Sequence, residues 1–361
     1  MYENSRRNFL KKAGSVTGAT FAFGAPAVHV ARKYNWRMVT AWPPHSPLLG
    51  EGAEMLARLI EEMSGGKLKI RIYGGGELVP PLESFEAVSQ GVIEMGHGSS
   101  YFWGGKATAA IFFTAVPFGM TAQQTNGWFY AGGGLELWQE VYAPFNLISM
   151  PVANTGVQMG GWFNKEIRTI EDYKGLKMRM PGFGGRVITK AGATVVLSVG
   201  SEIYMNMERG VIDAAEWVGP YHDYLMGFHR TAKYYYYPGW QEPSATLELF
   251  INKHAFESLT KDLQTVIKTA AYRMNLWVLS EFESRNNIYL QKLINGYGVQ
   301  LKRFPDSVLK ALKGHTKEVM DELTSKDPMS KKVYASYRKF QKDVSAWAAV
   351  SEIAYSSIIG L

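Results

Sequence analysis

The chain has 361 residues, enough for two lobes or for one domain with extensions, and its 46% hydrophobic and 20% charged residues are typical of a globular protein. It contains no cysteine, which excludes disulfides, thiolate metal ligands and a cysteine nucleophile. Its formal net charge is +7, but lysine and arginine form no basic stripe, so nucleic acid is not an expected partner.

The first predicted element is an export signal. Residues 5–11 read SRRNFLK, close to the twin-arginine consensus S-R-R-x-F-L-K, and the mildly hydrophobic stretch Ala13–Val28 is too short to span a bilayer. We therefore predict a twin-arginine signal peptide over residues 1–31 and a periplasmic mature chain. The alternative is an anchored or cytosolic N-terminus. Without this segment, which carries four basic residues and one acidic residue, the formal net charge is +4.

Strands and helices are predicted to alternate in the first half of the mature chain. The hydrophobic pattern predicts a strand over Trp36–Ala41, a helix over Leu49–Met63, a strand over Leu68–Tyr73, a helix over Leu82–Gln90 and a strand from Val92 onward. This β-α-β-α-β order predicts a mainly parallel sheet covered by helices.

The second half repeats part of this pattern. The stretch ESFEAVSQGVIE at 83–94 aligns with EIYMNMERGVID at 202–213, and KIRI at 69–72 has a counterpart in KMRM at 177–180. Two matches in the same order predict two related α/β lobes. The alternative is that helix-glycine-strand junctions resemble one another by chance.

The remainder of the chain is predicted to be mainly helical. A long amphipathic stretch covers Phe256–Asn295, a short strand covers Val299–Phe304, and two helices cover roughly Ser307–Leu323 and Met329–Ile358. In the last helix, apolar residues recur at alternating four- and three-residue steps, namely Val333, Tyr337, Phe340, Val344 and Trp347. This heptad seam predicts either packing on the chain's own body or a dimer interface.

The sequence offers little support for catalysis. Its seven histidines are scattered, with no H-E-x-x-H motif, and there is no G-x-S-x-G nucleophile elbow. The adjacent pair His222-Asp223 could perform acid–base chemistry, but such pairs are common in surface loops.

Two charged residues instead indicate a binding site at strand ends. Ligands of doubly wound sheets sit beyond the carboxyl ends of the strands. Arg179 is near the end of a predicted strand, Leu176–Met180, where a guanidinium could clamp a carboxylate through two parallel hydrogen bonds. The alternative is a solvated arginine at a strand end.

Glu216 is predicted to lie inside a buried strand, Val211–Val218, where a lone carboxylate costs several kcal/mol unless it is paired or binds a cation. A cation between Glu216 and an anionic ligand on Arg179 would remove their repulsion. Gln158 and Gln241 could add neutral oxygens to the same ion. Pairing of Glu216 with Arg179 or Lys177 is the alternative, and the sequence alone does not bring these residues together.

Two longer motifs resemble a known family. LKMRMPG at 176–182 and GVIDAAEWVGPY at 210–221 closely resemble the periplasmic solute receptors of TRAP transporters, and more narrowly their 2-oxo-acid-binding branch. The resemblance runs through essentially the whole mature chain. One departure is VVLSVG at 195–200, where relatives often carry a proline-containing stretch.

This resemblance implies an α/β, two-lobed periplasmic binding protein fold with crossing segments, a long spine helix and a helical C-terminus. Lobe I would comprise residues 32–155 with part of 246–295. Lobe II would comprise 156–245 with a return strand near 299–304. Residues 305–361 would form C-terminal helices and a possible dimerisation element.

The resemblance also implies a site. Arg179 would pair with the ligand carboxylate, and Tyr101 or Phe102, from the loop at 99–102, would cover the ligand. A bound cation, usually sodium with calcium as the alternative, would be held by Gln158, Glu216, the Trp217 carbonyl and Gln241.

The implied function is that of a solute-binding subunit, not an enzyme. It would capture a small 2-oxo monocarboxylate similar to pyruvate, deliver it to the membrane permease, and dimerise by exchanging its C-terminal helix. The alternatives are a receptor of the same fold for lactate or another organic acid with a divalent ion, and a periplasmic hydrolase or lyase using Glu216 and His222.

Overall fold

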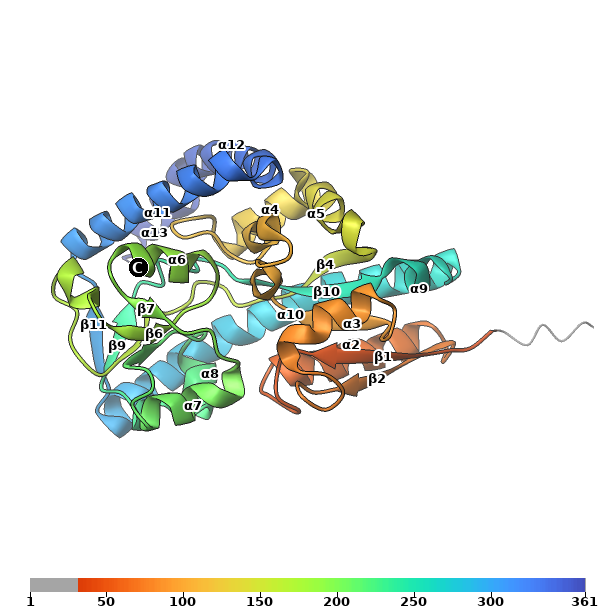
Figure 1. The fold of residues 1–361 in the computed structure, drawn as a ribbon, viewed down its shortest axis with the longest axis horizontal. Helices are drawn as coiled ribbons and strands as arrows, with labels where there is room; N and C mark the ends of the chain where they lie inside the picture. The colour runs from red at the N-terminus through yellow and green to blue at the C-terminus, as the bar shows by residue number, and fades with distance from the viewer. Residues whose placement is uncertain (1–31, 361) are drawn as a thin grey trace, which may run out of the picture. The chain divides into compact units, whose positions relative to one another are not determined.

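The structure is a computed structural model that describes residues 32–360, so the predicted signal peptide lies outside the described residues. The described residues form two β-sheets with helices packed around both (Figure 1). We name the lobes after these sheets. The strands of the first lobe are β1 (Tyr34–Thr40), β2 (Leu68–Tyr73), β3 (Met95–Gly98), β4 (Leu147–Asn154) and β10 (Thr246–Asn252). Those of the second are β5 (Gly161–Phe163), β6 (Lys177–Arg179), β7 (Thr194–Val195), β8 (Ala214–Ala215), β9 (Tyr234–Tyr237) and β11 (Gln300–Arg303).

The helices are α2 (Leu49–Met63), α3 (Ser84–Ser89), α4 (Ala122–Ala131), α5 (Gly134–Tyr142), α6 (Gly182–Lys190), α7 (Gly200–Glu208), α8 (Pro220–Leu225), α9 (Lys253–Glu257), α10 (Lys261–Gln291), α11 (Asp306–Lys326), α12 (Pro328–Val350) and α13 (Glu352–Ile358).

The first sheet has the strand order β2-β1-β3-β10-β4. Strand β1 is parallel to β2 and β3, which confirms the predicted β-α-β-α-β run. Strand β10 lies antiparallel between β3 and β4, so the sheet is mixed, and β10 is the one described strand that departs from the predicted mainly parallel sheet. The cause is a strand that returns from much later in the chain. Gly96 of β3 allows its close approach, because a Cβ there would lie 2.2 Å from the Phe250 ring.

The second sheet, of order β11-β9-β5-β8-β6-β7, repeats this topology from β7 to β9 and has β11 as an additional edge strand. Strand β6 is parallel to β7 and β8, and β5 is antiparallel to β8 and β9. The alignment of 83–94 with 202–213 is confirmed, because Glu94 accepts a bond from the Arg37 amide at 2.8 Å and Asp213 one from the Lys177 amide at 2.9 Å. The match of 69–72 with 177–180 is wrong: β6 corresponds to β1, and the counterpart of β2 is β7.

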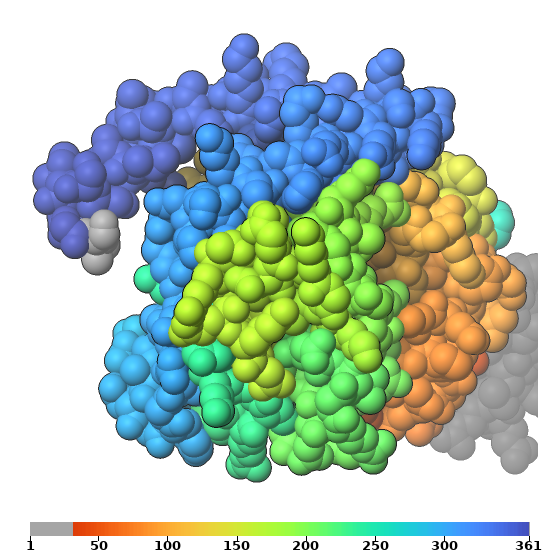
Figure 2. Space-filling model, turned by 60° about the vertical axis from the view of Figure 1, so that its left-hand side comes forward, coloured from red at the N-terminus to blue at the C-terminus, as the bar shows by residue number. Residues whose placement is uncertain are grey.

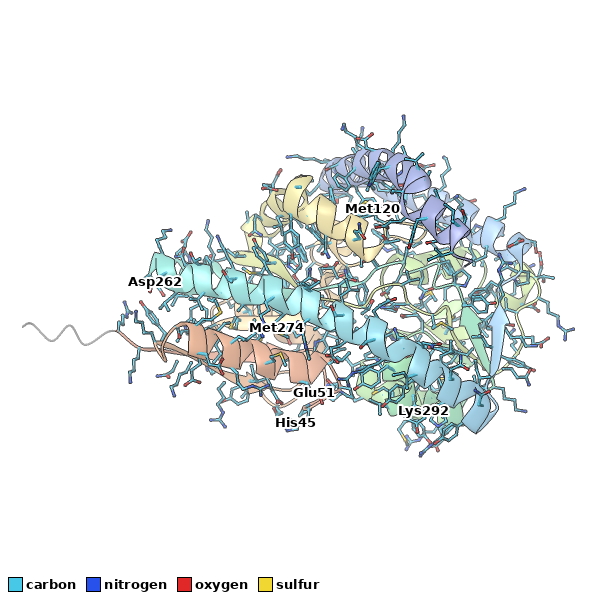
Figure 3. The ribbon with its side chains drawn as sticks, turned by 180° about the vertical axis from the view of Figure 1, so that it is seen from behind. His45, Glu51, Met120, Asp262, Met274 and Lys292 are labelled. Atoms are coloured by element: carbon cyan, nitrogen blue, oxygen red, sulfur yellow. The ribbon has the colours of Figure 1, made fainter. Side chains whose placement is uncertain are left out.

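Helix α10 joins the two lobes. It packs on α2 and β4 in the first lobe and on α8 in the second. Figure 3 shows it crossing the back of the molecule, with Asp262 near one end and Lys292 just beyond the other. It is the predicted spine helix, although the single stretch predicted over Phe256–Asn295 is divided between α9 and α10.

The C-terminal helices also touch both lobes. Helix α11 packs on α6 of the second lobe, and α12 packs on α4 and α5 of the first. In the predicted heptad seam, Val333 and Tyr337 are buried against this body, and the Tyr337 hydroxyl accepts a bond from the Met120 amide at 2.7 Å. Trp347 is 66% exposed, and α13 begins after a break at Ser351, so the predicted helix Met329–Ile358 is two helices. Figure 2 shows this end projecting from the body.

Two predicted strands begin too early. Val92 and Val211 are 56% and 48% exposed, and their amides bond back to the Ala87 and Asn206 carbonyls of the preceding helices. Strand pairing starts only at Met95 in β3, and in β8 it covers two residues instead of the predicted Val211–Val218. Both valines therefore follow a helix and do not belong to a strand.

No helix among residues 32–360 is long and apolar enough to cross a membrane. The lobe boundaries predicted above, at 32–155 and 156–245, remain a prediction.

Candidate functional site

Arg179 and Glu216 form a buried ion pair. Arg179 ends β6, and Glu216 directly follows β8, the neighbouring parallel strand, so both lie at the same edge of the second sheet. Arg179 Nη1 donates to Glu216 Oε2 at 2.8 Å and to the Glu216 carbonyl at 2.7 Å. Their side chains are 1% and 0% exposed. The carboxylate predicted inside a strand thus lies just beyond one and has a cationic partner.

This pair leaves polar atoms without partners. Arg179 Nη2 and Glu216 Oε1 are buried and make no hydrogen bond within the described part of the chain. The third guanidinium nitrogen, Nε, lies 3.4 Å from the Ser198 carbonyl, in the loop that departs from the family pattern. Buried polar groups are rarely left unpaired, so these atoms indicate a ligand-binding site.

Three further oxygens in the same region are also unpaired. They are Gln158 Oε1, Gln241 Oε1 and Glu242 Oε2, again counting partners among residues 32–360 only. Gln158 Nε2 donates to Thr155 Oγ1 at 3.1 Å and Gln241 Nε2 donates to the Met159 carbonyl at 2.8 Å, so each amide has a bonded nitrogen and a free oxygen. Amide, carboxylate and carbonyl oxygens are the ligands that hard cations prefer.

The segments that carry these amides are bound together by their backbones. The backbone N–H of Gln158 donates to the backbone carbonyl of Glu242 at 3.1 Å. Gly239 permits this approach, because a Cβ there would lie 2.1 Å from the Gln158 carbonyl oxygen. The Met159 backbone amide, next to Gln158, donates to the Val218 carbonyl at 3.1 Å, so these segments also lie beside the strand end that carries Glu216. The structure therefore brings together Gln158, Arg179, Glu216 and Gln241, which the sequence could not.

Trp217 completes this arrangement. Its ring lies under the Arg179 guanidinium, whose Cζ is 5.0 Å from the ring centroid. Gly200 makes room for the ring, since a Cβ there would lie 2.5 Å from Trp217. The residue predicted to give its backbone carbonyl to a cation thus also supports the arginine through its side chain.

Glu242 was missed by the sequence analysis. Burial raises the pKa of Glu242 to about 8, with Arg179 and Gln158 opposing the shift. Burial also raises the pKa of Glu216 well above its usual value; the charge of Glu242 adds to this rise and Arg179 opposes it. Two buried carboxylates that repel each other favour the binding of a proton or a cation. Only the tertiary structure reveals this neighbour, because Glu242 follows Gln241 in a loop without periodicity.

Tyr101 and Phe102 approach this site from the first lobe. A Cβ on Gly182 of the second lobe would lie 3.3 Å from the Tyr101 ring, so this ring crosses between the lobes. The pKa of Tyr101 is raised by burial and by Glu242, and lowered by Arg179, which places its hydroxyl within range of their charges. Both rings line a groove of about 350 Å³ together with Met180, Arg186 and Leu197.

The predicted acid–base residue His222 is buried, and both of its ring nitrogens have hydrogen-bond partners. Trp217 Nε1 donates to His222 Nδ1, and His222 Nε2 lies 2.9 Å from the Pro47 carbonyl. Burial lowers the pKa of His222 to about 4. Neither ring nitrogen contacts Glu216, so the arrangement does not favour the hydrolase or lyase alternative.

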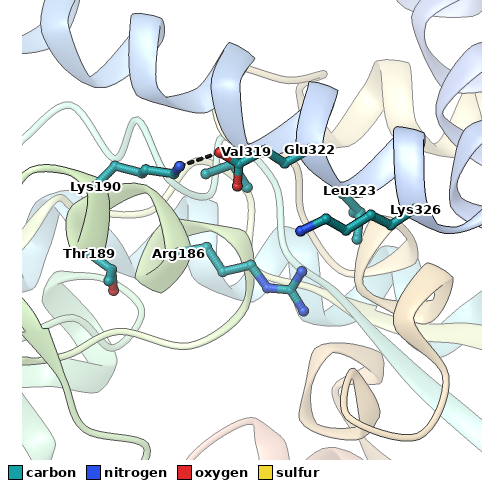
Figure 4. Close-up of a pocket in the computed structure, with 7 residues that line it drawn as sticks. All are labelled: Arg186, Thr189, Lys190, Val319, Glu322, Leu323 and Lys326. Atoms are coloured by element: carbon teal, nitrogen blue, oxygen red, sulfur yellow. Dashed lines mark hydrogen bonds and ion pairs between the residues drawn. The ribbon is translucent and has the colours of Figure 1, made fainter.

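A second pocket, of about 270 Å³, lies between α6 and α11. Figure 4 shows Arg186 and Lys326 reaching into it, while Lys190 pairs with Glu322. Arg186 lines both this pocket and the groove beside Tyr101, but none of the unpaired oxygens belongs to the pocket. Its positive charge suits an anionic solute approaching the groove.

Within residues 32–360, no group of three or more histidines, aspartates or glutamates could hold a metal ion. The candidate cation site is therefore of another kind, in which carboxylates act together with amide and backbone oxygens.

Comparisons with known proteins agree with this geometry. Residues 38–327 match the family described as bacterial extracellular solute-binding protein, family 7. The chain is 41% identical, over 98% of both chains, to the monocarboxylate 2-oxoacid-binding periplasmic protein of Nostoc sp.. Two similar solved structures, each with a TM-score of 0.88, are TRAP periplasmic solute-binding proteins.

The first solved structure, from Pseudoalteromonas atlantica, is 42% identical, covers 90% of this chain and 99% of its own, and contains sodium and pyruvate. The second, from Colwellia psychrerythraea, is 41% identical with the same coverage and contains calcium and pyruvate. The predicted fold and the resemblance are both confirmed. The chain belongs to the family 7 bacterial extracellular solute-binding proteins, the periplasmic receptors of TRAP transporters.

Proposed function

We propose that this protein captures a small 2-oxo monocarboxylate, similar to pyruvate, together with a cation, and delivers it to the membrane subunits of a TRAP permease. The observation that carries the proposal is the fully buried Arg179, whose Nη1 is bonded to Glu216 and whose Nη2 has no partner among the described residues. The relative from Nostoc and the two pyruvate-containing structures support the choice of acid.

Arg179 would bind the carboxylate of the acid. Glu216 and the Trp217 ring hold the guanidinium in place, so little conformational entropy is lost when a carboxylate bonds to Nη2. Tyr101 and Phe102 would cover the acid from the first lobe. A charge-assisted bond in such a buried place is stronger than one between neutral groups.

Gln158, Glu216, the Trp217 carbonyl and Gln241 would hold the cation, with sodium as the proposed ion and calcium as the alternative. The free oxygens of both glutamines and of Glu216 fit this role. The cation would supply positive charge between the buried carboxylate and the 2-oxo acid, which otherwise repel each other. The two similar structures contain one ion each, sodium or calcium, with the same acid.

The net charge of the occupied site distinguishes sodium from calcium. With Glu216 and Glu242 ionised, Arg179 protonated and one acid anion bound, a divalent ion makes the site neutral, whereas sodium leaves one negative charge. With Glu242 protonated, sodium makes the site neutral. The protonation state of Glu242 therefore affects which cation suits the site, even if Glu242 is not itself a ligand of the ion.

Export through the twin-arginine route and dimerisation through the C-terminal helix complete the proposal. The SRRNFLK stretch supports the first. For the second, the end of α12 and α13 expose apolar side chains that the body leaves uncovered, namely Trp347, Val350, Ile353, Tyr355 and Ile358. Several large apolar side chains exposed on one short stretch of helix are typical of an association site.

Titration calorimetry of the mature protein with pyruvate tests the proposal, in sodium buffer, in calcium buffer, and after chelation with sodium removed. We expect binding that requires one of the two cations. Unchanged affinity without either cation would contradict the cation site.

A thermal-shift panel of pyruvate, lactate and bulkier organic acids then tests the acid, since a bound ligand raises the melting temperature. Stabilisation by lactate but not by pyruvate would select the alternative receptor. Turnover of a stabilising acid, followed by NMR, would select the enzyme.

A further inference from the structure

His222 lies on α8 of the second lobe and is 1% exposed. Its ring packs against Phe282 of the spine helix, with 6.3 Å between the ring centroids. In the proposed function this histidine has no task. Its two hydrogen bonds, however, lead in opposite directions, one to the ligand site and the other to the first lobe.

The partners of His222 require one form of its ring. An indole N–H can only donate, so the Nδ1 that it contacts carries no proton. The Pro47 carbonyl can only accept, so Nε2, 2.9 Å away, carries one. The imidazole is therefore neutral, in the tautomer with the proton on Nε2.

The first of these bonds reaches the ligand site through Trp217. Its indole N–H bonds His222 while its ring face supports Arg179. An indole held at its nitrogen cannot rotate away from the guanidinium. The orientation of the Trp217 ring therefore depends on His222.

The second bond reaches the loop between β1 and α2 in the first lobe, where Pro47 lies. Close to this contact, the Trp42 ring of the first lobe lies 6.5 Å from Trp217, edge to face. Pro47, His222, Trp217 and Arg179 thus form one continuous chain of contacts from the first lobe to the binding arginine.

We propose that His222 is a positioning residue that links the approach of the first lobe to the orientation of Trp217 and Arg179. This inference rests on the proposed function of the same site. When Pro47 meets His222, the histidine ring is fixed and Trp217 is held under the guanidinium. When the lobes part, Trp217 loses this support and the ligand is released faster.

The test compares His222→Phe, which removes both bonds, with His222→Gln, whose amide nitrogen can still reach the Pro47 carbonyl. The matched control is Tyr235→Phe, which removes a buried bond of 2.7 Å to Asp223 inside the second lobe. Pyruvate affinity, its dissociation rate and the melting temperature without ligand are measured for each.

We expect His222→Phe to bind pyruvate about 10- to 100-fold more weakly through faster dissociation, as for a buried donor left unpaired. His222→Gln should retain more of the affinity than His222→Phe. Tyr235→Phe should lower the melting temperature without changing the dissociation rate. An unchanged dissociation rate in His222→Phe, or an equal increase in Tyr235→Phe, would overturn the inference.

A second measurement needs no ligand and separates this inference from the proposed function. The Trp217 indole proton is followed by NMR hydrogen exchange in the ligand-free protein, where His222→Phe should speed its exchange and Tyr235→Phe should not. Equal exchange in all three proteins would overturn the inference even if pyruvate binds. Wild-type protein that does not bind any 2-oxo acid would overturn the proposed function alone.

Discussion

Arg179 bonds Glu216 twice through one nitrogen, at 2.8 Å to the carboxylate and at 2.7 Å to the backbone carbonyl. The arginine is thereby held by the neighbouring strand, and its second terminal nitrogen has no hydrogen-bond partner among residues 32–360. One terminal nitrogen of the guanidinium therefore fixes the side chain to Glu216, and the other is available to bind the carboxylate of the acid.

Replacement of Arg179 should severely weaken binding of the acid. Arg179→Ala removes one partner of a buried charge pair, which typically costs about 2–5 kcal/mol. Arg179→Lys keeps the charge but cannot bond Glu216 and a carboxylate with the same fixed geometry, so we expect a loss of at least about 1.4 kcal/mol, or tenfold in affinity. Calorimetry with pyruvate measures both. The control is Arg186→Lys, beside the groove, and retained affinity in Arg179→Lys would refute the clamp.

Substitution of Glu242 should change the choice of cation. Above about pH 8, where Glu242 is ionised, Glu242→Gln removes one negative charge from the site, and the Coulomb energy lost by a divalent ion is twice that lost by a monovalent ion. We expect calcium affinity to fall more than sodium affinity, measured by calorimetry with saturating pyruvate. Glu248→Gln, which alters a buried carboxylate in the first lobe, is the matched control. An equal change for both ions would show that Glu242 does not select charge.

Glu248 should make stability depend on pH. Burial raises its pKa from 4.5 to about 7, although Ser149, Trp103 and Tyr142 donate to it. A carboxyl with a raised pKa stabilises the fold below its unfolded pKa, and this contribution is lost as pH rises through the folded pKa. Between about pH 4.5 and pH 7 the loss reaches roughly 3 kcal/mol.

Urea unfolding at a series of pH values, compared between wild type and Glu248→Gln, measures this contribution. As the pH rises through this window, the free energy of unfolding of wild type should fall relative to that of Glu248→Gln, because glutamine does not titrate. Parallel curves for the two proteins would show that Glu248 keeps an ordinary pKa.

The exposed end of the C-terminal helices should carry the proposed dimer. Trp347 and Ile358 are 66% and 80% exposed, and burial of a large apolar side chain contributes about 1.5–3 kcal/mol. Trp347→Glu together with Ile358→Glu should therefore convert a dimer into a monomer in light scattering, with pyruvate affinity retained. Leu276→Glu, which alters an exposed leucine on α10, is the control. A dimer that survives the double substitution would place the interface elsewhere.

Local patterns determined much of the fold. The helix Leu49–Met63 and the strand Leu68–Tyr73 have the predicted bounds, because a buried stripe in α2 and alternation in β2 leave a periodic signal in adjacent residues. The repeat that aligns residues 83–94 with 202–213 also identified equivalent strands in the two lobes. The pattern failed where valines follow a helix, since Val92 and Val211 are apolar but bond back to the helix carbonyls.

The sequence by itself determined several of the helical and strand segments, the repeat shared by the two lobes and the residue types able to bind an acid and a cation. Only the tertiary structure decided that Gln158, Arg179, Glu216 and Gln241 meet, that Glu242 joins them, and that His222 bonds Trp217 and Pro47. The reason is physical: whether a buried polar atom is satisfied depends on partners supplied by distant segments. Residues adjacent in sequence do not reveal which nitrogen or oxygen the folded chain leaves free.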